Sequence, residues 1–210
     1  IAGGDLLPAL RIDGRLGIHL PADLHADYSF FEDARYRFAE SEVPYGETFA
    51  EYRRTKRHVG NEPVFVPYQG SEAYTPVAYL PYAAVALVGR IVGADFLSML
   101  YGMRLMGLAA STAIIAAAIA IAPGLRWPFL LIALLPSALY GRATINADGA
   151  AIALAILVAA FVLRAGARAM PQVAARQRAA WMTLCMLVKP SQLALAPIEL
   201  LASRWPNIRW

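Results

Sequence analysis

One uncharged apolar run constrains the fold of this chain more than any other feature. Leu105 to Leu125 is a stretch of 21 residues without a charged side chain, and Pro123-Gly124 stand at its end. A helix that crosses a bilayer needs about 20 predominantly apolar residues, since the hydrocarbon layer is about 30 Å thick. We therefore expect a transmembrane helix over about residues 104–124.

Two further apolar segments, each of 15 uncharged residues, follow this run and are flanked by arginines. They become crossings if their ends gain one turn, or if the side chains of Arg142 and Arg164 extend to the headgroups. The tight polar turn Asn146–Gly149 lies between them. The pattern predicts a hairpin of two crossings, over about 127–144 and 148–165.

The last apolar block covers about residues 179–202 and is interrupted by Lys189-Pro190 and by Glu199. It is either one kinked crossing or two half-length helices that meet at Lys189, and the sequence leaves both alternatives open. Counted as one crossing, it brings the number of predicted crossings to about four.

A shorter apolar and aromatic stretch, Tyr74–Val92, precedes these crossings and contains Pro76 and Pro81. Proline cannot continue the hydrogen-bond ladder inside a helix, so we expect the helix to begin near Pro81. The remaining stretch, about 81–93, is too short for a crossing. It is predicted to be an interfacial helix.

Residues 1–72 contain no apolar stretch long enough to cross a membrane, and they are rich in turn residues. Aromatic and small side chains at helical spacing predict a helix over about 27–42, and a shorter helix is expected over 47–58. The rest of this segment is predicted to be loop. With residues 73–210 as a transmembrane domain, the fold class is an all-α polytopic membrane protein with a mixed helix and loop segment outside the membrane.

The distribution of charge predicts the orientation in the membrane. Residues 1–72 carry 8 Lys/Arg and 12 Asp/Glu, whereas residues 73–210 carry 11 and 3. The loop Arg164–Arg178 holds four arginines and no acid, and Arg126 lies in another loop on the same side. By the positive-inside rule both loops are cytoplasmic. Residues 1–72 and the turn Asn146–Gly149 are then extracytoplasmic, in a bacterial inner membrane, and we expect no nucleic-acid partner.

The single cysteine, Cys185, lies inside an apolar run. It has no partner within the chain for a disulfide, and a cysteine metal site is excluded. We expect it to be a small buried hydrophobe.

Several short motifs follow one another along nearly the whole chain. They are the opening Ile1–Pro8 with Gly17–Pro21, the aromatic-proline stretch Tyr74–Tyr82, the Arg-led Tyr101–Leu105, the turn Asn146–Gly149 and the Lys-Pro element Val188–Pro190. Their order resembles that of a large bacterial family of predicted membrane proteins of unknown function, whose members often sit among cell-surface polysaccharide genes. Each motif alone is weak, but the ordered set is fairly specific.

That family is similar in organisation to the GT-C glycosyltransferases, multi-span enzymes that use polyprenyl-phosphate-linked sugars at the extracytoplasmic face. The resemblance implies a GT-C-like fold and transfer of a sugar from such a carrier to a cell-surface glycan or lipid. It also implies an acidic pair followed by a histidine at the start of the first external loop. That element would lie directly before Ile1, so we expect this sequence to be a fragment that lacks the family's first helix.

Charged residues beside apolar sequence are the candidate site residues, because ionisable groups are costly inside a membrane. Asp148 is the candidate catalytic base, with capping of the following helix as the alternative interpretation. Lys189, Arg104 and Arg142 are candidate ligands for the phosphate of a lipid carrier. Their alternatives are extension to the headgroups and, for Arg104, an ion pair with Asp148.

Aromatic residues ahead of the predicted interfacial helix form a second group of candidates. Tyr74 and Tyr79, with Tyr82, are expected to anchor the chain at the level of the headgroups. Stacking of these rings on a sugar is the alternative interpretation.

Two polar patterns in residues 1–72 have a less specific meaning. Asp23, His25 and Asp27 would share one face of a strand and could bind a metal there, but on a helix or loop they would not converge. The run Arg53–His58 is expected to be a solvated helix face, with contact to anionic headgroups or a pyrophosphate donor as the minor alternative. The cofactor is left open: a divalent metal is one alternative, for which the sequence offers no support.

Two other functions remain beside the glycosyltransferase hypothesis. A non-enzymatic polysaccharide export component would place charged residues along a path through several helices. The middles of the first three predicted crossings carry no charge, so this alternative is less favoured. A scaffold subunit of a membrane assembly is the third.

Overall fold

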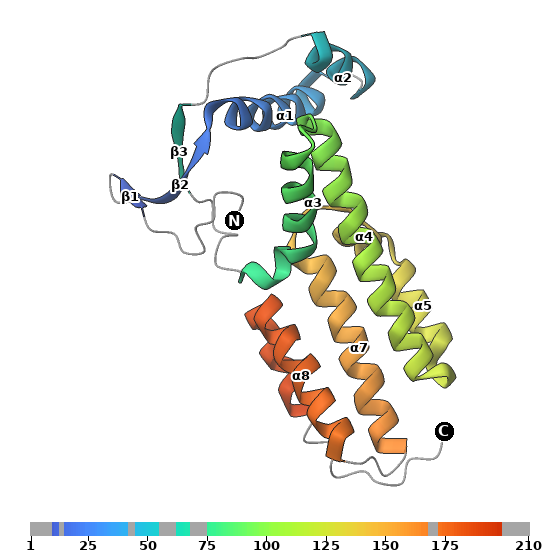
Figure 1. The fold of residues 1–210 in the computed structure, drawn as a ribbon. Helices are drawn as coiled ribbons and strands as arrows, with labels where there is room; N and C mark the ends of the chain where they lie inside the picture. The colour runs from blue at the N-terminus through green and yellow to red at the C-terminus, as the bar shows by residue number, and fades with distance from the viewer. Residues whose placement is uncertain are drawn as a thin grey trace. The chain divides into compact units, whose positions relative to one another are not determined.

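The computed structural model describes residues 10–12, 15–41, 45–54, 62–67, 75–167 and 172–198. The chain divides into two compact units, Asp5–Ser71 and a helical unit of Glu72–Trp210 together with Ile1–Gly4. Each unit is described by itself (Figure 1).

The first unit contains a small antiparallel sheet, which the sequence did not predict. Its strands are ordered β1-β2-β3 and cover Leu10–Ile12, Arg15–Pro21 and Pro63–Pro67. In the register, His19 faces Phe65, and their rings meet edge to face with centroids 5.8 Å apart. A Cβ on Gly17 would lie 2.5 Å from Cζ of Phe65, so only glycine leaves room for that ring. The prediction of loop here is wrong, because strands this short give too few alternating residues to recognise.

Two helices complete the described part of this unit, α1 (Ala22–Ser41) and α2 (Tyr45–Arg54). Helix α1 begins five residues earlier than predicted, where the backbone N–H of Ala22 donates to the carbonyl of Glu62, 3.0 Å away. Four aromatic rings pack where the two helices meet, with neighbouring centroids 4.8–5.8 Å apart: Phe30, Phe31, Phe49 and Tyr52. Residues 55–58 of the predicted second helix lie outside the described residues.

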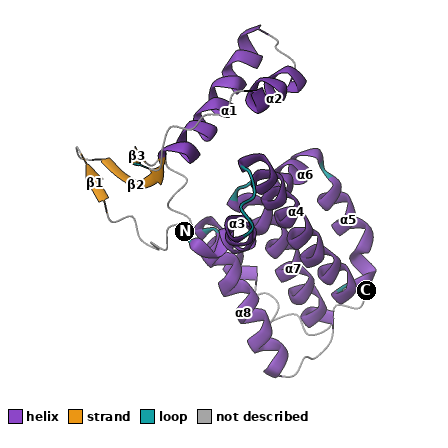
Figure 2. Ribbon diagram, turned by 45° about the horizontal axis from the view of Figure 1, so that its top comes forward, coloured by secondary structure: helices purple, strands orange, loops and turns teal. Residues whose placement is uncertain are grey.

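The helical unit is a bundle preceded by a 3₁₀ turn at Pro76–Tyr79 (Figure 2). Its helices are α3 (Leu80–Ile91), α4 (Phe96–Ile121), α5 (Arg126–Leu134), α6 (Pro136–Ala143), α7 (Ala147–Ala167) and α8 (Gln172–Val188). Helix α7 packs against α4, α6 and α8. In α7, 61% of the apolar 18-residue stretch is buried inside the protein, against 22% in α4. Helix α7 therefore forms the centre of the bundle, whereas most of the surface of α4 faces away from the other helices.

Two helices in the described part of the chain are long and apolar enough to cross a membrane, α4 and α7. A third crossing is obtained if α5 and α6, with the turn before them, count as one span, but the two parts are bent by 70°. The bend falls at Leu135, whose ψ of 136° is extended, as a residue before proline prefers. The crossing predicted over 127–144 is therefore broken at Pro136, which has no N–H to continue the ladder.

The observed bounds of α4 and α8 differ from the predicted ones. Helix α4 begins at Phe96, so Arg104 lies inside it rather than at its start. Helix α8 ends at Val188, and Lys189 is extended before a 3₁₀ stretch at Pro190–Leu195. The chain breaks at Lys189, as both alternatives for 179–202 expect, and residues 199–202 lie outside the described part.

The helix directions give the bundle two chemically different ends (Figure 1). One end, which we call the Asp148 end, collects the starts of α4 and α7 and the end of α8. The other, the basic end, collects the ends of α4 and α7 and the starts of α5 and α8. The basic end carries the exposed arginines Arg126, Arg164 and Arg176 and the partly buried Arg178.

Candidate functional site

The candidate site is built around the turn that leads from α6 into α7. Asn146 stands directly before α7, and its side-chain Oδ1 accepts hydrogen bonds from the backbone N–H of Asp148 at 2.9 Å and of Gly149 at 3.1 Å. This is the arrangement of a helix N-cap, in which one side chain satisfies N–H groups of the first turn. The cap is therefore Asn146 and not Asp148, and the Asp148 carboxylate is left for another contact.

Asp148 forms an ion pair with Lys189, 41 positions later in the chain. The lysine is the extended residue between α8 and the 3₁₀ stretch, a conformation that the following proline favours. The side chain of Asp148 is 53% exposed and that of Lys189 is 25% exposed. The structure thus brings together two of the predicted site residues at a place that an outside molecule can reach.

Arg104 lies at the same turn, approached from α4. Its Nε donates to the backbone carbonyl of Ala143, 2.7 Å away, at the end of α6. That carbonyl has no partner within α6, because the last carbonyls of a helix lack an intrahelical donor. Arg104 is partly buried and holds the end of α6 beside the start of α7.

Tyr82 supports the turn from α3. Its side chain is only 4% exposed, so it packs inside the protein rather than facing the headgroups as predicted. Its hydroxyl donates toward the carbonyls of Thr144 at 3.3 Å and Asn146 at 3.4 Å. Its ring lies so close to α4 that a Cβ on Gly107 would be 2.3 Å from the ring edge. Burial raises the pKa of the Tyr82 phenol above its usual 10.0, which keeps the hydroxyl a donor at physiological pH.

Tyr79 lies next to Tyr82, with the two ring centroids 6.3 Å apart. Tyr74, the other predicted aromatic, lies outside the described residues. Thr75 was not singled out in the sequence, but its hydroxyl donates to the carbonyl of Leu187 and so joins the 3₁₀ turn to the end of α8, two residues before Lys189. No residue pattern indicates such a contact between segments 112 positions apart.

Arg142 has a different environment from the other predicted cations. It is 3% exposed, and its guanidinium donates to the carbonyls of Ala133 and, at 3.2 Å, of Ala138. The first of these carbonyls belongs to the last turn of α5, where the helix breaks. Within the described residues, Arg142 therefore bridges the bend between α5 and α6 rather than joining the Asp148–Lys189 pair.

The other polar patterns do not converge on a site. Asp23, His25 and Asp27 all lie in α1, where successive residues turn by about 100° and His25 points away from the other two. The described residues contain no group of three or more His, Cys, Asp or Glu side chains that could hold a metal ion. Arg53 and Arg54 form the exposed last turn of α2, and residues 55–58 of the basic run lie outside the described part. Cys185 is completely buried in α8.

Comparison with known proteins places most of both units in one family. Residues 15–209 match a family described as "Predicted membrane protein (DUF2142)". Neither a curated protein nor a solved structure matches the chain. Because the match covers far more than half of the sequence, this chain belongs to that family of membrane proteins of unknown function.

Proposed function

We propose that the protein is a membrane glycosyltransferase of GT-C type, which transfers a sugar from a polyprenyl-phosphate carrier to a cell-surface glycan or lipid. The observation that carries the proposal is the exposed Asp148–Lys189 ion pair at one end of the bundle. A carboxylate can act as a general base, and an ammonium group can hold a phosphate as a compact point charge. The two groups that the transfer needs therefore lie in contact.

The position of this pair relative to the arginines supports the proposed side of the membrane. Arg126, Arg164 and Arg176 lie at the opposite, basic end, which the positive-inside rule assigns to the cytoplasm. The Asp148 end is then extracytoplasmic, the face at which GT-C enzymes use lipid-linked sugars.

The proposed reaction is a direct displacement at the anomeric carbon of the sugar. The acceptor hydroxyl oxygen forms the new C–O bond, the bond from the anomeric carbon to the phosphate oxygen breaks, and the electron pair leaves with the phosphate. Asp148 takes the proton of the acceptor hydroxyl. Lys189 exchanges its carboxylate partner for the phosphate as the carrier binds, which frees Asp148 and stabilises the departing charge.

Arg104 and Tyr79 have supporting roles in this proposal. Arg104 uses Nε on the Ala143 carbonyl, which leaves the terminal nitrogens of its guanidinium to face a phosphate. Tyr79 offers a ring face to a sugar beside Tyr82. Arg142, the remaining predicted cation, acts on this site through the bend that it stabilises.

The test is sugar transfer by the full-length protein in proteoliposomes supplied with a radiolabelled polyprenyl-phosphate sugar and surface-glycan acceptors. Asp148→Asn is expected to lower the transfer rate by about 100-fold or more, because general-base catalysis contributes about 10²–10⁴. Lys189→Met should lower it as well. Asp95→Asn, an exposed acid ahead of α4, is the matched control and should transfer at the wild-type rate.

The same vesicles separate this function from its alternatives. Wild-type activity in the Asp148→Asn protein would remove Asp148 from the mechanism. Movement of labelled lipid-linked glycan across the bilayer without transfer would favour an export component. A scaffold subunit would be favoured if the wild type neither transferred the sugar nor moved the glycan, and if the Asp148 and Lys189 variants changed only the stability of the protein.

A further inference from the structure

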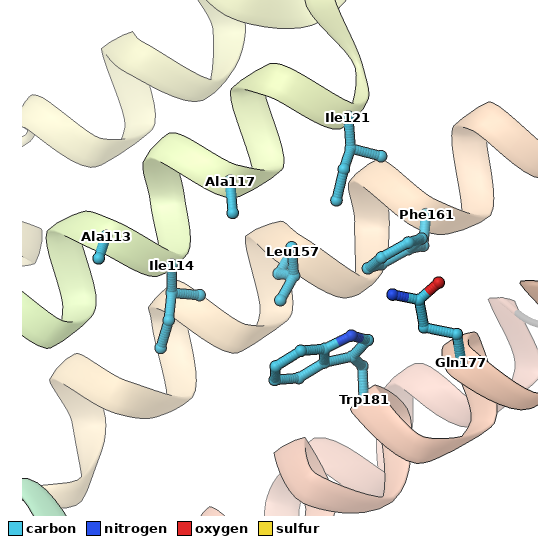
Figure 3. A pocket seen from close by; sticks show the side chains of 8 residues that line it. All are labelled: Ala113, Ile114, Ala117, Ile121, Leu157, Phe161, Gln177 and Trp181. Atoms are coloured by element: carbon cyan, nitrogen blue, oxygen red, sulfur yellow. The ribbon is translucent and has the colours of Figure 1, made fainter.

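An apolar groove runs along the helical unit between α4, α7 and α8 (Figure 3). Its volume is about 350 Å³, at the lower end of the about 300–1,000 Å³ of ligand pockets. Its walls are Ala113, Ile114, Ala117, Ile121, Leu157, Phe161, Gln177 and Trp181. Small alanines on α4 leave the space open, and larger side chains of α7 and α8 enclose it from the other side.

One end of the groove, which we call its polar end, carries an amide, and the rest is lined by hydrocarbon side chains and the Trp181 ring. In Figure 3 the Gln177 amide reaches toward Phe161 at the end marked by Ile121, while the Trp181 ring lies farther along beside Leu157. Gln177 is the only amide or charged side chain among the lining residues. The groove therefore suits a molecule with a long apolar part and a polar group at one end.

The polar end of the groove lies at the basic end of the bundle. Arg164 follows Phe161 by one helical turn, Arg176 directly precedes Gln177, and both arginines are exposed. The sequence contains no Asp or Glu between residues 96 and 147 or between 149 and 198. No carboxylate from these segments can neutralise the arginines, so the basic end attracts anions from outside them.

We propose that this groove binds one acyl chain of an anionic glycerophospholipid, with the lipid phosphate at Arg164 and Arg176. Basic pockets between helices at the cytoplasmic face bind anionic headgroups in this way, each arginine or lysine strengthening the attraction. Gln177 can donate from its amide to an ester or phosphate oxygen at the level where the chain enters. A second copy of this chain fits less well, because side by side in the membrane it would bring the same arginines to the same level.

This lipid site is separate from the proposed transfer site. It lies at the basic end, whereas Asp148 and Lys189 lie at the opposite end of the bundle. Binding of the lipid can therefore be tested whether or not the protein transfers a sugar.

The experiment measures retained lipid by native mass spectrometry of the purified full-length protein. The protein is incubated in detergent with phosphatidylglycerol or with phosphatidylcholine of identical acyl chains. Wild type should retain phosphatidylglycerol in preference to phosphatidylcholine. Ala117→Phe fills the groove and should abolish retention of both, whereas Ala116→Phe, an exposed neighbour outside the groove, should retain both as wild type does.

A second pair of variants tests the charge without touching the groove. Arg164→Gln with Arg176→Gln should remove the preference for phosphatidylglycerol, by about fivefold for each arginine. Arg90→Gln, an exposed arginine at the end of α3, should keep it.

Three results would overturn the proposal. The first is equal retention by the Ala116 and Ala117 variants, and the second is an unchanged preference without Arg164 and Arg176. The third is an Ala117-dependent dimer, or Ala117-dependent retention of polyprenyl phosphate alone, either of which would give the groove another occupant.

Discussion

Asn146 and Asp148 have separate roles at the turn before α7: one caps the helix and the other forms an ion pair. Asn146 caps α7, and Asp148, inside the first turn, reaches Lys189. An exposed ion pair contributes only about 0–1 kcal/mol to stability. The pair therefore stabilises the fold only slightly. Replacement of the carboxylate by a phosphate as the partner of Lys189 costs little free energy, as the proposed reaction requires.

Arg142 is the residue whose removal should affect stability most directly. In Arg142→Met the carbonyl of Ala133 loses its donor, and an unpaired buried carbonyl costs about 1–3 kcal/mol. We expect a clear fall in the melting temperature of the detergent-solubilised protein, followed by tryptophan fluorescence. Arg126→Met is the matched control, because Arg126 is exposed and stacks on Trp127 at 5.6 Å, and a surface change of this kind stays within about 0.5 kcal/mol. Equal melting temperatures for the two variants would contradict the bridging role of Arg142.

At the scale of the elements, the hairpin of α6 and α7 depends on close approach of two backbones. A Cβ on Gly149 would lie 2.6 Å from the carbonyl oxygen of Gly141 and 2.8 Å from Cα of Arg142. Neither contact is with a flexible side chain that could move aside. The hairpin therefore needs glycine at the first turn of α7, and this requirement holds α6 against the turn that carries Asp148.

The substitution Gly149→Ala tests this packing. Forcing extra volume into a tight contact costs about 1–3 kcal/mol, so the variant should unfold at a lower temperature and, in the proteoliposome assay, transfer more slowly. At Gly124 a Cβ would meet nothing within 4 Å, so Gly124→Ala should melt at or slightly above the wild-type temperature. A Gly149→Ala protein as stable as Gly124→Ala would show that the two helices can separate without cost.

The sequence predicted those helices that are defined by the length of an uncharged apolar run or by a proline at one end. The uncharged runs predicted α4 and α7, which are long and apolar enough to cross, and Pro81 and Lys189-Pro190 marked a helix start and a helix end. The bend at Pro136 was missed because the run was judged by its apolar length, and proline is as uncharged as leucine. The strands were missed because pairing of β2 with β3 joins residues more than 40 positions apart.

The sequence predicted the charged residues of the candidate site but not the contacts between them. Asp148, Lys189 and Arg104 stood out because charges are rare in this half of the chain. That Asp148 meets Lys189, and that Tyr82 and Thr75 tie the turn and α8 to the start of the unit, depends on how the helices pack. Packing of this kind leaves no periodic pattern in a single sequence.

At the scale of the whole molecule, the two units and the two ends of the bundle make the orientation testable. The first unit is predicted to be outside the cytoplasm and the basic end inside it. Gly46 in the first unit and Gly124 at the basic end are both positions where a Cβ meets nothing within 4 Å. The natural cysteine, Cys185, is completely buried and gives little background.

Gly46→Cys and Gly124→Cys can therefore report the side on which each part lies. In intact cells a membrane-impermeant maleimide should label Gly46→Cys, whereas Gly124→Cys should react only after the cells are opened. Unmodified protein should stay unlabelled in both conditions. The reverse pattern would invert the orientation and move Asp148 to the cytoplasmic side.

The length of α4 has a consequence for the bilayer itself. At about 1.5 Å per residue, the part of α4 from Arg104 to Ile121 is about 27 Å long, close to the thickness of the hydrocarbon layer of about 30 Å. The turns from Phe96 to Arg104 add about 12 Å. With Arg104 at the headgroup boundary, these turns stand above the apolar layer and raise the α3–α4 junction out of it. In a thicker membrane the same turns would enter the apolar layer, or α4 would tilt less from the membrane normal. The height of that junction above the apolar layer therefore depends on the thickness of the host membrane.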